Sequence, residues 1–346
     1  ARDEQGDPVY NVVGLDLPSG PGRARIDAVN NGNFPLTAQD PALEQAFHRA
    51  KQTGNLSATW EPEALAAASV IVVDIPLDVQ DGSDSPDPLT PHVDFAPFVK
   101  SMTTIGQHMD PTALVLVETT VPPGTCEHVV LPVLQQCFAK RGLDPDPILL
   151  AHSYERVMPG AQYYDSMVNF WRVFSAHTED AAHRAEAFLA SVINTRDFPL
   201  RRLESMTASE TAKVLENSYR AVNIAFMEEW GRFAETMGID LFEVIEAIRV
   251  RPTHNNIRQP GFGVGGYCLT KDPLFAEVAA RQIFSRPDVE FPFCRKAITA
   301  NSAMPLVTLG KVRGLLGGDL TGKRILLCGV SYRPDVADTR YAPAET

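Results

Sequence analysis

Short apolar runs rich in β-branched residues recur along the first half of the chain and alternate with amphipathic stretches. The runs cover residues 9–17, 70–75, 113–119 and 146–153, with helical patterns such as 41–52 and 61–68 between them. Strands that alternate with helices predict a parallel, doubly wound sheet, and continuously apolar strands fit such a sheet because helices cover both faces. The sequence therefore predicts an α/β fold.

The charge balance limits the class of partner. Among 346 residues, 43 are acidic and 31 basic, which gives a net charge of −12. An acidic surface argues against non-specific binding to nucleic acid or to a membrane, although a locally basic pocket can still bind an anion. Five cysteines are too few, and odd in number, for a disulfide framework. We therefore expect a reducing, cytoplasmic setting.

A long helix is predicted after residue 200. Thr207 and Glu210 have the spacing of a capping box, and from there to Met237 the chain has no proline and a single glycine, Gly231. About 30 helical residues span about 45 Å, more than one small domain usually needs. The pattern predicts a second, helical domain.

Aromatic residues along this predicted helix indicate a subunit contact. Phe226, Trp230 and Phe233 need more apolar cover than one small domain provides. We therefore expect a homodimer with a two-fold contact built on residues 207–237.

The remaining sequence is less regular. Further helices are predicted at 240–250, 272–282 and 290–303, and a new strand at 322–330. The acidic, Ser- and Pro-rich stretch 81–91 is predicted to be a solvated loop.

The segment PGFGVGGYCLTKDP, residues 260–273, is the most informative motif. A helix that begins near Cys268 would lower the pKa of its thiol and place Asp272 on the same face, with Lys271 as a nearby cation. The alternative is a glycine-rich surface turn beside an ordinary buried cysteine. The glycines of the motif are Gly261, Gly263, Gly265 and Gly266.

Two polar residues share one stripe of the long helix. Lys213 and Asn217 are four residues apart, and a cation and an amide aimed together can stabilise an oxyanion. The alternative is an exposed polar face, on which Glu210 is a salt-bridge partner.

Polar residues also follow the predicted strands, where open α/β sheets bind ligands. Glu118, Thr119 and Thr120 follow one strand, and Glu155 and Arg156 follow another. Each set has a plain alternative, a loop in the first case and a local ion pair in the second.

Asp16 ends the first predicted strand, as does the acid that binds adenine ribose in dinucleotide folds. A turn-forming aspartate is the alternative, and no G-x-G-x-x-G precedes Asp16. The eight histidines show no metal spacing, so no metal site is expected.

Taken together, these segments resemble the UDP-glucose/GDP-mannose dehydrogenase family of nucleotide-sugar 6-dehydrogenases. The matches follow the family's order over nearly the whole chain: VVGLDL, VETTVPPGT, SYERVMPG, ETAKVLENSYRAVNIAF, PGFGVGGYCLTKDP and GKRILLCGVSYRPDVADTRYAP. The resemblance implies a Rossmann-like NAD domain over residues 1–203, a central helical dimerisation domain over 204–303, and a linker and the start of a second Rossmann-like domain over 304–346.

The resemblance implies a four-electron oxidation of a nucleotide sugar at C6 with two NAD⁺ reduced, for polysaccharide or glycoconjugate synthesis. Cys268 matches the nucleophile that forms a thiohemiacetal and then a thioester. Lys213 and Asn217 match oxyanion-stabilising residues, and Asp272 matches an acid that orders water. Thr120 matches a water-holding hydroxyl.

The resemblance also assigns binding roles, and Glu155 matches the base proposed for thioester hydrolysis. The implied cofactor-binding residues are Asp16, Arg25, Glu118, Thr119 and Thr120. The implied substrate-binding residues are Glu155, Arg156, Lys213, Asn217, Gly263, Gly265, Gly266 and Arg333, the last at a family lysine that faces the phosphates.

Some positions depart from the family pattern. Tyr154 replaces a proline, and Leu77 and Asp78 stand where a Thr-Pro pair often lies beside the cofactor. Arg251 and His254 are both candidates for the residue that reaches the partner subunit's sugar.

Details of several motifs favour a UDP-N-acetylhexosamine, followed by UDP-glucose and then GDP-mannose. A two-electron NAD dehydrogenase and an inactive, binding-only homologue are the rival functions. The family's first strand, glycine loop and first helix have no match here, nor does most of its C-terminal domain. We therefore expect about 20 to 30 residues to be missing upstream, and weak NAD⁺ binding by residues 1–346 alone.

Overall fold

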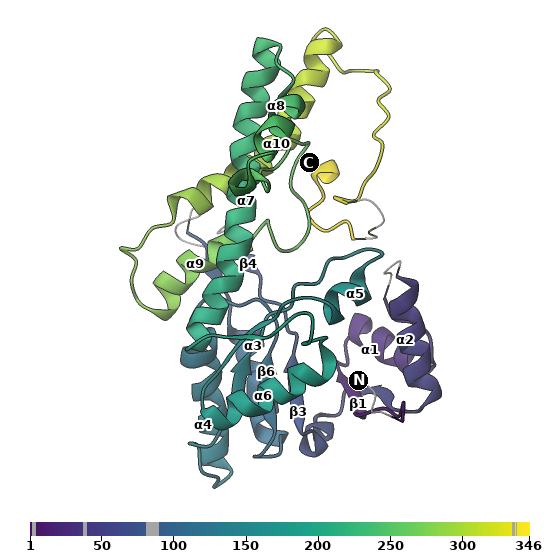
Figure 1. Cartoon of the computed structure of the whole chain (residues 1–346), viewed down its shortest axis with the longest axis vertical. Coiled ribbons are helices and arrows are strands. Elements are labelled where there is room, and N and C mark those ends of the chain that lie inside the picture. The colour runs from purple at the N-terminus through teal and green to yellow at the C-terminus, as the bar shows by residue number, and fades with distance from the viewer. Residues whose placement is uncertain (2–4, 37–39, 81–89, 334–335, 337) are drawn as a thin grey trace. The chain divides into compact units, whose positions relative to one another are not determined.

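The computed structural model describes residues 1, 5–36, 40–80, 90–333, 336 and 338–346 (Figure 1). The chain forms two compact units. The N-terminal unit contains Ala1–Leu77 and Asp94–Glu210, and the C-terminal unit contains Asp78–Val93 and Thr211–Thr346. Residues 81–89 of the predicted loop lie outside the described part of the chain.

A five-stranded sheet of order β3-β6-β7-β8-β9 forms the centre of the N-terminal unit. β3 pairs in parallel with β6, and β6 with β7, as the sequence predicts. β7 and β8 pair antiparallel, because the segment between them holds the six-residue helix α5 in place of a full crossover helix. The bounds are β3 Val70–Val73, β6 Leu114–Val117, β7 Leu150–His152, β8 Val173–Ala176, β9 Arg201–Arg202 and α5 Tyr163–Val168.

A separate pair of parallel strands, β1 (Val12–Leu15) and β2 (Leu56–Thr59), precedes this sheet. Among the described strands β1 pairs with β2 alone. The flanking helices are α1, Gly20–Asn30, and α2, Pro41–Gln52, the latter as predicted. The helix predicted at 61–68 is a 3-10 turn over Pro62–Ala67.

Helices cover the central sheet and complete its core. All four residues of β6 are buried, and Leu114 and Leu116 pack with Phe174 of β8 and with Ala185 and Leu189 of α6. Such continuous burial explains the apolar run that predicted this strand. The helices are α3 Ala96–His108, α4 Leu131–Lys140, which follows a π-helical turn at Cys126–Val130, and α6 Glu179–Val192.

The C-terminal unit is mainly helical. Helix α7 (Met206–Met237) runs 32 residues, close to the predicted 207–237. Residues of α7 such as Met227 and Ala234 pack with Leu241 and Ile245 of α8. The other helices are α8 Leu241–Arg249, α9 Phe275–Val278 and α10 Pro292–Leu315. None of the described helices is long and apolar enough to cross a membrane.

A short hairpin between β3 and α3 belongs to the C-terminal unit. It consists of β4 (Val79–Gln80) and β5 (His92–Val93). The side-chain amide of Gln282 forms two hydrogen bonds with the backbone of Val93. It accepts the Val93 N–H at 2.9 Å and donates to the Val93 carbonyl at 3.0 Å.

The strand predicted at 322–330 is wrong. These residues have no regular structure, and Ile325, Leu326 and Val330 are exposed. A lone strand needs a neighbour for its backbone hydrogen bonds, and none of the described strands pairs with this segment.

The capping box predicted for α7 is also wrong, because its two residues have partners elsewhere. The Thr207 hydroxyl donates to Glu127 at 2.7 Å, and the Met206 N–H donates to the same carboxylate at 3.1 Å. Glu127 lies in the π-helical turn before α4, so a carboxylate from another helix caps α7.

Glu210, in the first turns of α7, in turn caps the π-helical turn that contains Glu127. Its carboxylate accepts the N–H groups of Gly124 at 2.5 Å and Cys126 at 2.8 Å, at the start of the π-helical turn. The side chain is fully buried. Burial raises the pKa of Glu210 to about 8, against the lowering effect of the Cys126 and Gly124 donors. The acidic side chains of Glu127 and Glu210 thus join the starts of the two helices.

This raised pKa predicts a pH-dependent stability. The folded protein keeps the Glu210 proton up to about pH 8, whereas the unfolded chain releases it near the ordinary value of 4.5. The wild type should therefore lose stability relative to Glu210→Gln as the pH rises between these values, by at most about 1.4 kcal/mol per pH unit. Thermal unfolding midpoints across this range test the slope. Parallel profiles would contradict it, and Glu186→Gln on the exposed surface is the control.

Candidate active site

Cys268 lies exposed in a tight turn that precedes helix α9. Its carbonyl accepts the N–H of Lys271 at 3.3 Å and of Asp272 at 2.9 Å, which closes one helical turn. Pro273 has no N–H to continue the pattern, so α9 begins only at Phe275. Regular helical structure therefore begins at Asp272, as predicted for 272–282, and Cys268 forms a single turn with Asp272 in place of a helix start.

Asp272 connects this turn to α7. Its carboxylate is fully buried, accepts the Asn217 side-chain amide at 2.7 Å and pairs with the Lys271 ammonium at 2.9 Å. Lys213, one turn before Asn217 on α7, is also buried. The expected alternative of an exposed polar face on α7 does not hold for these two residues.

Tyr267, immediately before Cys268, is held on several sides. The Lys271 ammonium lies 4.3 Å from its ring centroid and the Arg340 guanidinium 5.0 Å. Burial, together with a hydrogen bond to the Asp78 carboxylate, raises the pKa of the Tyr267 hydroxyl. Asp78, at a position where the family often has proline, therefore has a defined partner next to the candidate nucleophile.

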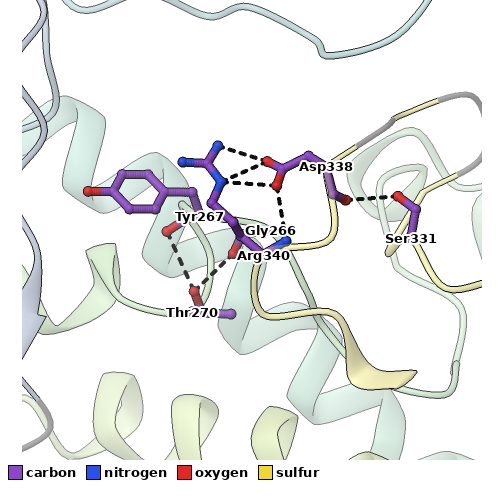
Figure 2. Close-up of polar contacts among 6 residues, drawn as sticks. All are labelled: Gly266, Tyr267, Thr270, Ser331, Asp338 and Arg340. Carbon is purple, nitrogen blue, oxygen red and sulfur yellow. Dashed lines mark hydrogen bonds and ion pairs between the residues drawn. The ribbon is translucent and has the colours of Figure 1, made fainter. Parts of the chain in front are cut away.

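The glycine loop lies against the C-terminal segment (Figure 2). The Gly266 N–H donates to the Arg340 carbonyl at 3.1 Å, and the Arg340 guanidinium pairs with Asp338 at 2.8 Å. A Cβ at Gly265 would lie 2.5 Å from the Tyr332 Cβ, and Gly266 has a φ of +85°. Both positions therefore require glycine because the chain approaches so closely.

Gly263 and Arg333, also expected to bind substrate, lie in the same unit. A Cβ at Gly263 would lie 2.7 Å from Pro343, which makes this a third close approach. Arg333 is exposed, directly after the Tyr332 that covers Gly266. Arg251 and His254 are exposed on the loop after α8, and nothing distinguishes their predicted roles.

In the N-terminal unit, polar residues gather where β3 and β6 end. The N–H groups of Glu118 and Thr119 both donate to the Val73 carbonyl, at 3.0 and 3.2 Å. The Glu118 carboxylate forms an ion pair with the buried Arg172, and Thr120 is half-buried. Arg172 directly precedes β8, and no pattern in the sequence distinguished it.

Glu155 and Arg156, which follow β7, have different hydrogen-bond partners. Glu155 accepts the N–H of Val157. Arg156 donates to the Trp171 carbonyl at 2.8 Å and to the Tyr154 hydroxyl at 2.9 Å. The guanidinium of Arg156 thus has protein partners in the position where we expected it to bind substrate.

Asp74, at the end of β3, is a further acid that the sequence analysis missed. It is open to solvent, yet the surrounding protein and then the charges of Glu118 and Glu155 raise its pKa to about 6, while Arg172 opposes them. Its signal was available, because Asp74 follows an apolar strand as Asp16 does.

Asp16 and Arg25, which are both expected to bind the cofactor, contact each other. Arg25 of α1 donates to Asp16 at 2.7 Å, and this hydrogen bond holds the pKa of Asp16 below its usual range. An ionised carboxylate after the first strand suits the ribose hydroxyls of NAD, so these residues fit that cofactor.

The expected catalytic residues thus divide between the two units. Cys268, Lys213, Asn217 and Asp272 belong to the C-terminal unit, and Glu155 and Thr120 belong to the N-terminal unit. Within the described ranges no three His, Cys, Asp or Glu side chains are arranged to hold a metal ion.

Known proteins show the same organisation. Residues 9–193 match the NAD binding domain of the UDP-glucose/GDP-mannose dehydrogenase family, and residues 207–303 match that family's central domain. The UDP-N-acetyl-D-mannosamine dehydrogenase of Pyrococcus horikoshii is 30% identical over 97% of this chain and 73% of its own length. The enzyme of that name from Campylobacter jejuni is 27% identical, over 96% and 75%.

Solved structures of similar proteins have the same fold. That of UDP-D-ManNAc dehydrogenase from Pyrococcus horikoshii superposes with a TM-score of 0.82 at 27% identity, covering 97% of this chain and 74% of its own. A UDP-glucose dehydrogenase from Pyrobaculum islandicum has the same fold, with a TM-score of 0.81 at 24% identity over 98% of this chain and 72% of its own.

The buried ion pair of the site predicts a large effect on stability. Asp272→Ala leaves the buried Lys271 ammonium without its carboxylate, which typically costs about 3–5 kcal/mol. Asp272→Asn keeps an acceptor of the same shape and should cost less. Urea unfolding of the three proteins measures the difference, and an alanine variant as stable as the wild type would contradict the prediction.

Proposed function

Because the chain belongs to the UDP-glucose/GDP-mannose dehydrogenase family, we propose that it oxidises the C6 alcohol of a UDP-N-acetylhexosamine to a carboxylate. The protein is an NAD-dependent nucleotide-sugar dehydrogenase. The observation that carries the proposed chemistry is an exposed thiol, Cys268, one turn before the buried Asp272, which accepts the side-chain amide of Asn217 on α7.

The proposed reaction has two oxidation steps. Bound NAD⁺ supplies a hydride acceptor, and two are used for each sugar. The first oxidation converts the alcohol to an aldehyde. The Cys268 sulfur then adds to the aldehyde carbon to give a thiohemiacetal, whose loss of hydride leaves a thioester. Water attacks the thioester, which releases the carboxylate and restores the thiol.

The side chains around Cys268 suit these steps. A negative charge develops on the C6 oxygen when sulfur adds to the aldehyde and again when water attacks the thioester. The Lys213 ammonium and the Asn217 amide are the donors that we assign to this oxygen. Asp272 holds Asn217 in place through the bond at 2.7 Å, which limits the rearrangement needed in each step.

Further roles are proposed for residues of the N-terminal unit. We assign Glu155 as the base in hydrolysis and Thr120 as the residue that holds the water. Asp16 and Arg25, with Glu118 and Thr119, are assigned to the cofactor.

The relatives guide the choice of sugar. The Pyrococcus horikoshii and Campylobacter jejuni proteins are named for UDP-N-acetyl-D-mannosamine, which we therefore place first among the candidate substrates. A thiol that must stay reduced also favours the cytoplasm. UDP-glucose and GDP-mannose remain the alternative substrates.

The exposed aromatic residues of α7 support a homodimer. Phe226, Trp230 and Phe233 are 52%, 47% and 47% exposed and stack edge to face in sequence. An apolar stripe of this kind along a helix is typical of a subunit contact. We therefore propose a two-fold dimer built on α7.

Replacing the nucleophile tests the covalent route. Cys268→Ser should lower uronate formation in the native protein by about three orders of magnitude or more, because a hydroxyl lacks thiolate reactivity. Chromatography of the sugar products measures this, and Cys294→Ser should behave as wild type. Wild-type uronate formation by Cys268→Ser would refute the covalent mechanism.

A substrate panel tests the choice of sugar. The native protein should give two NADH per UDP-N-acetyl-D-mannosamine, with a higher kcat/KM than for UDP-glucose or GDP-mannose. A higher kcat/KM for UDP-glucose than for every acetamido sugar would overturn the ranking. One NADH per sugar would favour a two-electron dehydrogenase, and none at all a binding-only homologue.

Light scattering tests the assembly. At micromolar concentration the protein should have twice the mass of one chain, and Phe233→Asp should shift it toward the monomer because a charge enters the apolar contact. Phe293→Asp, at an exposed aromatic residue of α10, is the control. A monomeric wild type would rule out the dimer.

A further inference from the structure

The side chain of Tyr267, which directly precedes Cys268, is bound to a residue from a distant part of the sequence. Its hydroxyl forms a hydrogen bond with the Asp78 carboxylate, and both residues belong to the C-terminal unit. A carboxylate only accepts, so the tyrosine hydroxyl is the donor. Asp78 is exposed and Tyr267 is half-buried, which places this bond at the surface of the unit.

Asp78 directly precedes strand β4, so the hairpin of β4 and β5 fixes its position. Val79 of β4 pairs with Val93 of β5. The backbone of the buried Val93 in turn forms two hydrogen bonds with the side chain of Gln282, at 2.9 and 3.0 Å. Gln282 lies in the π-helical turn that continues α9. The hairpin that carries Asp78 is thus anchored to the helical segment that follows the candidate nucleophile.

The ring of Tyr267 is held as well as its hydroxyl. The Lys271 ammonium lies 4.3 Å from the ring centroid of Tyr267 and 4.4 Å from that of Phe275. Aromatic faces attract cations, more strongly where water is excluded, and Lys271 is buried. The same ammonium pairs with Asp272 at 2.9 Å. One buried cation therefore binds side chains on both sides of Cys268 in the sequence.

The turn that carries Cys268 has a second anchor on each side. After the thiol, Asp272 accepts the Asn217 amide of α7 at 2.7 Å. Before the thiol, Tyr267 donates to Asp78 of the hairpin segment. Cys268 itself is exposed, so the packing of a core does not fix its position. A reacting atom must be held within a fraction of an ångström for efficient attack, and such precision comes from the contacts of its neighbours.

We propose that Asp78 and Tyr267 are positioning residues for Cys268, and that their hydrogen bond holds the turn with the sulfur directed at the aldehyde carbon. This inference rests on the proposed function. Neither residue is assigned a contact with the reacting atoms. Because Asp78 is exposed, its substitution leaves the core intact, and the position of the turn can be tested apart from the stability of the fold.

Two variants remove this hydrogen bond and a third keeps it. Tyr267→Phe removes the hydroxyl but keeps the ring beside Lys271, and Asp78→Ala removes the acceptor. Each should lower kcat for uronate formation by the native protein about 10-fold, with KM for the nucleotide sugar within about twofold of wild type. Asp78→Asn keeps an oxygen acceptor and should restore most of kcat. The double variant should be no slower than either single variant, because both substitutions remove the same bond.

Tyr10→Phe is the matched control. The Tyr10 hydroxyl shares a hydrogen bond of 2.8 Å with Ser191 in the N-terminal unit, so the same chemical group is lost away from the turn and kcat should not change. Thermal unfolding midpoints close to wild type in every variant would separate position from stability. Wild-type kcat in both Tyr267→Phe and Asp78→Ala would overturn the inference. So would an Asp78→Asn variant as slow as Asp78→Ala, since the carboxylate charge would then matter in place of the hydrogen bond.

Hydrogen exchange at the turn needs no substrate, and it separates this inference from the proposed function. The N–H groups of Lys271 and Asp272 bind the Cys268 carbonyl at 3.3 and 2.9 Å. They should exchange about 10-fold faster in Tyr267→Phe and Asp78→Ala than in Asp78→Asn or the wild type.

The two measurements together assign each failure to its cause. If the wild type oxidises a nucleotide sugar while the variants keep its kcat, the dehydrogenase assignment stands and the positioning role is wrong. If the wild type oxidises none of the sugars while exchange at the turn accelerates in the variants, the oxidation is wrong and the anchoring of the turn by Asp78 and Tyr267 stands.

Discussion

The candidate active site depends on one buried carboxylate. Asp272 binds the Lys271 ammonium through one oxygen and the Asn217 amide through the other, with no exposure to solvent. Buried charges are costly unless their geometry is good, and breaking such a pair costs more than the pair contributes. The turn that carries Cys268 is therefore fixed to α7 at one point, on which the positions of Lys213 and Asn217 relative to the thiol also depend.

The sequence predicted the parts of the site that lie close together along the chain. Four glycines before Cys268 indicated close backbone contact, and the structure provides that contact from Tyr332 and Pro343. The spacing of Lys213 and Asn217 correctly placed both on one long helix. Cys268 begins a single turn and not a helix, because Pro273 has no N–H with which to continue the hydrogen-bond pattern.

Contacts between distant segments were harder to predict. Glu127 caps the start of α7, and Glu210 caps the start of the π-helical turn before α4. Local spacing alone suggested that Glu210 pairs with Thr207. The partners of Arg172 and Asp78 likewise come from elsewhere in the chain. Local patterns determine secondary structure, but they do not show which buried donor a carboxylate will meet once the chain is folded.

The hairpin of β4 and β5 has a consequence for how this chain can be divided. The C-terminal unit includes Asp78–Val93, a stretch that the gene encodes within the N-terminal unit. Dividing the chain once, between residues 210 and 211, would leave this hairpin on the N-terminal fragment. Val93 would then be separated from Gln282 on the C-terminal fragment. The C-terminal unit is therefore not a contiguous cassette, and recombination at one point cannot transfer it whole to another protein.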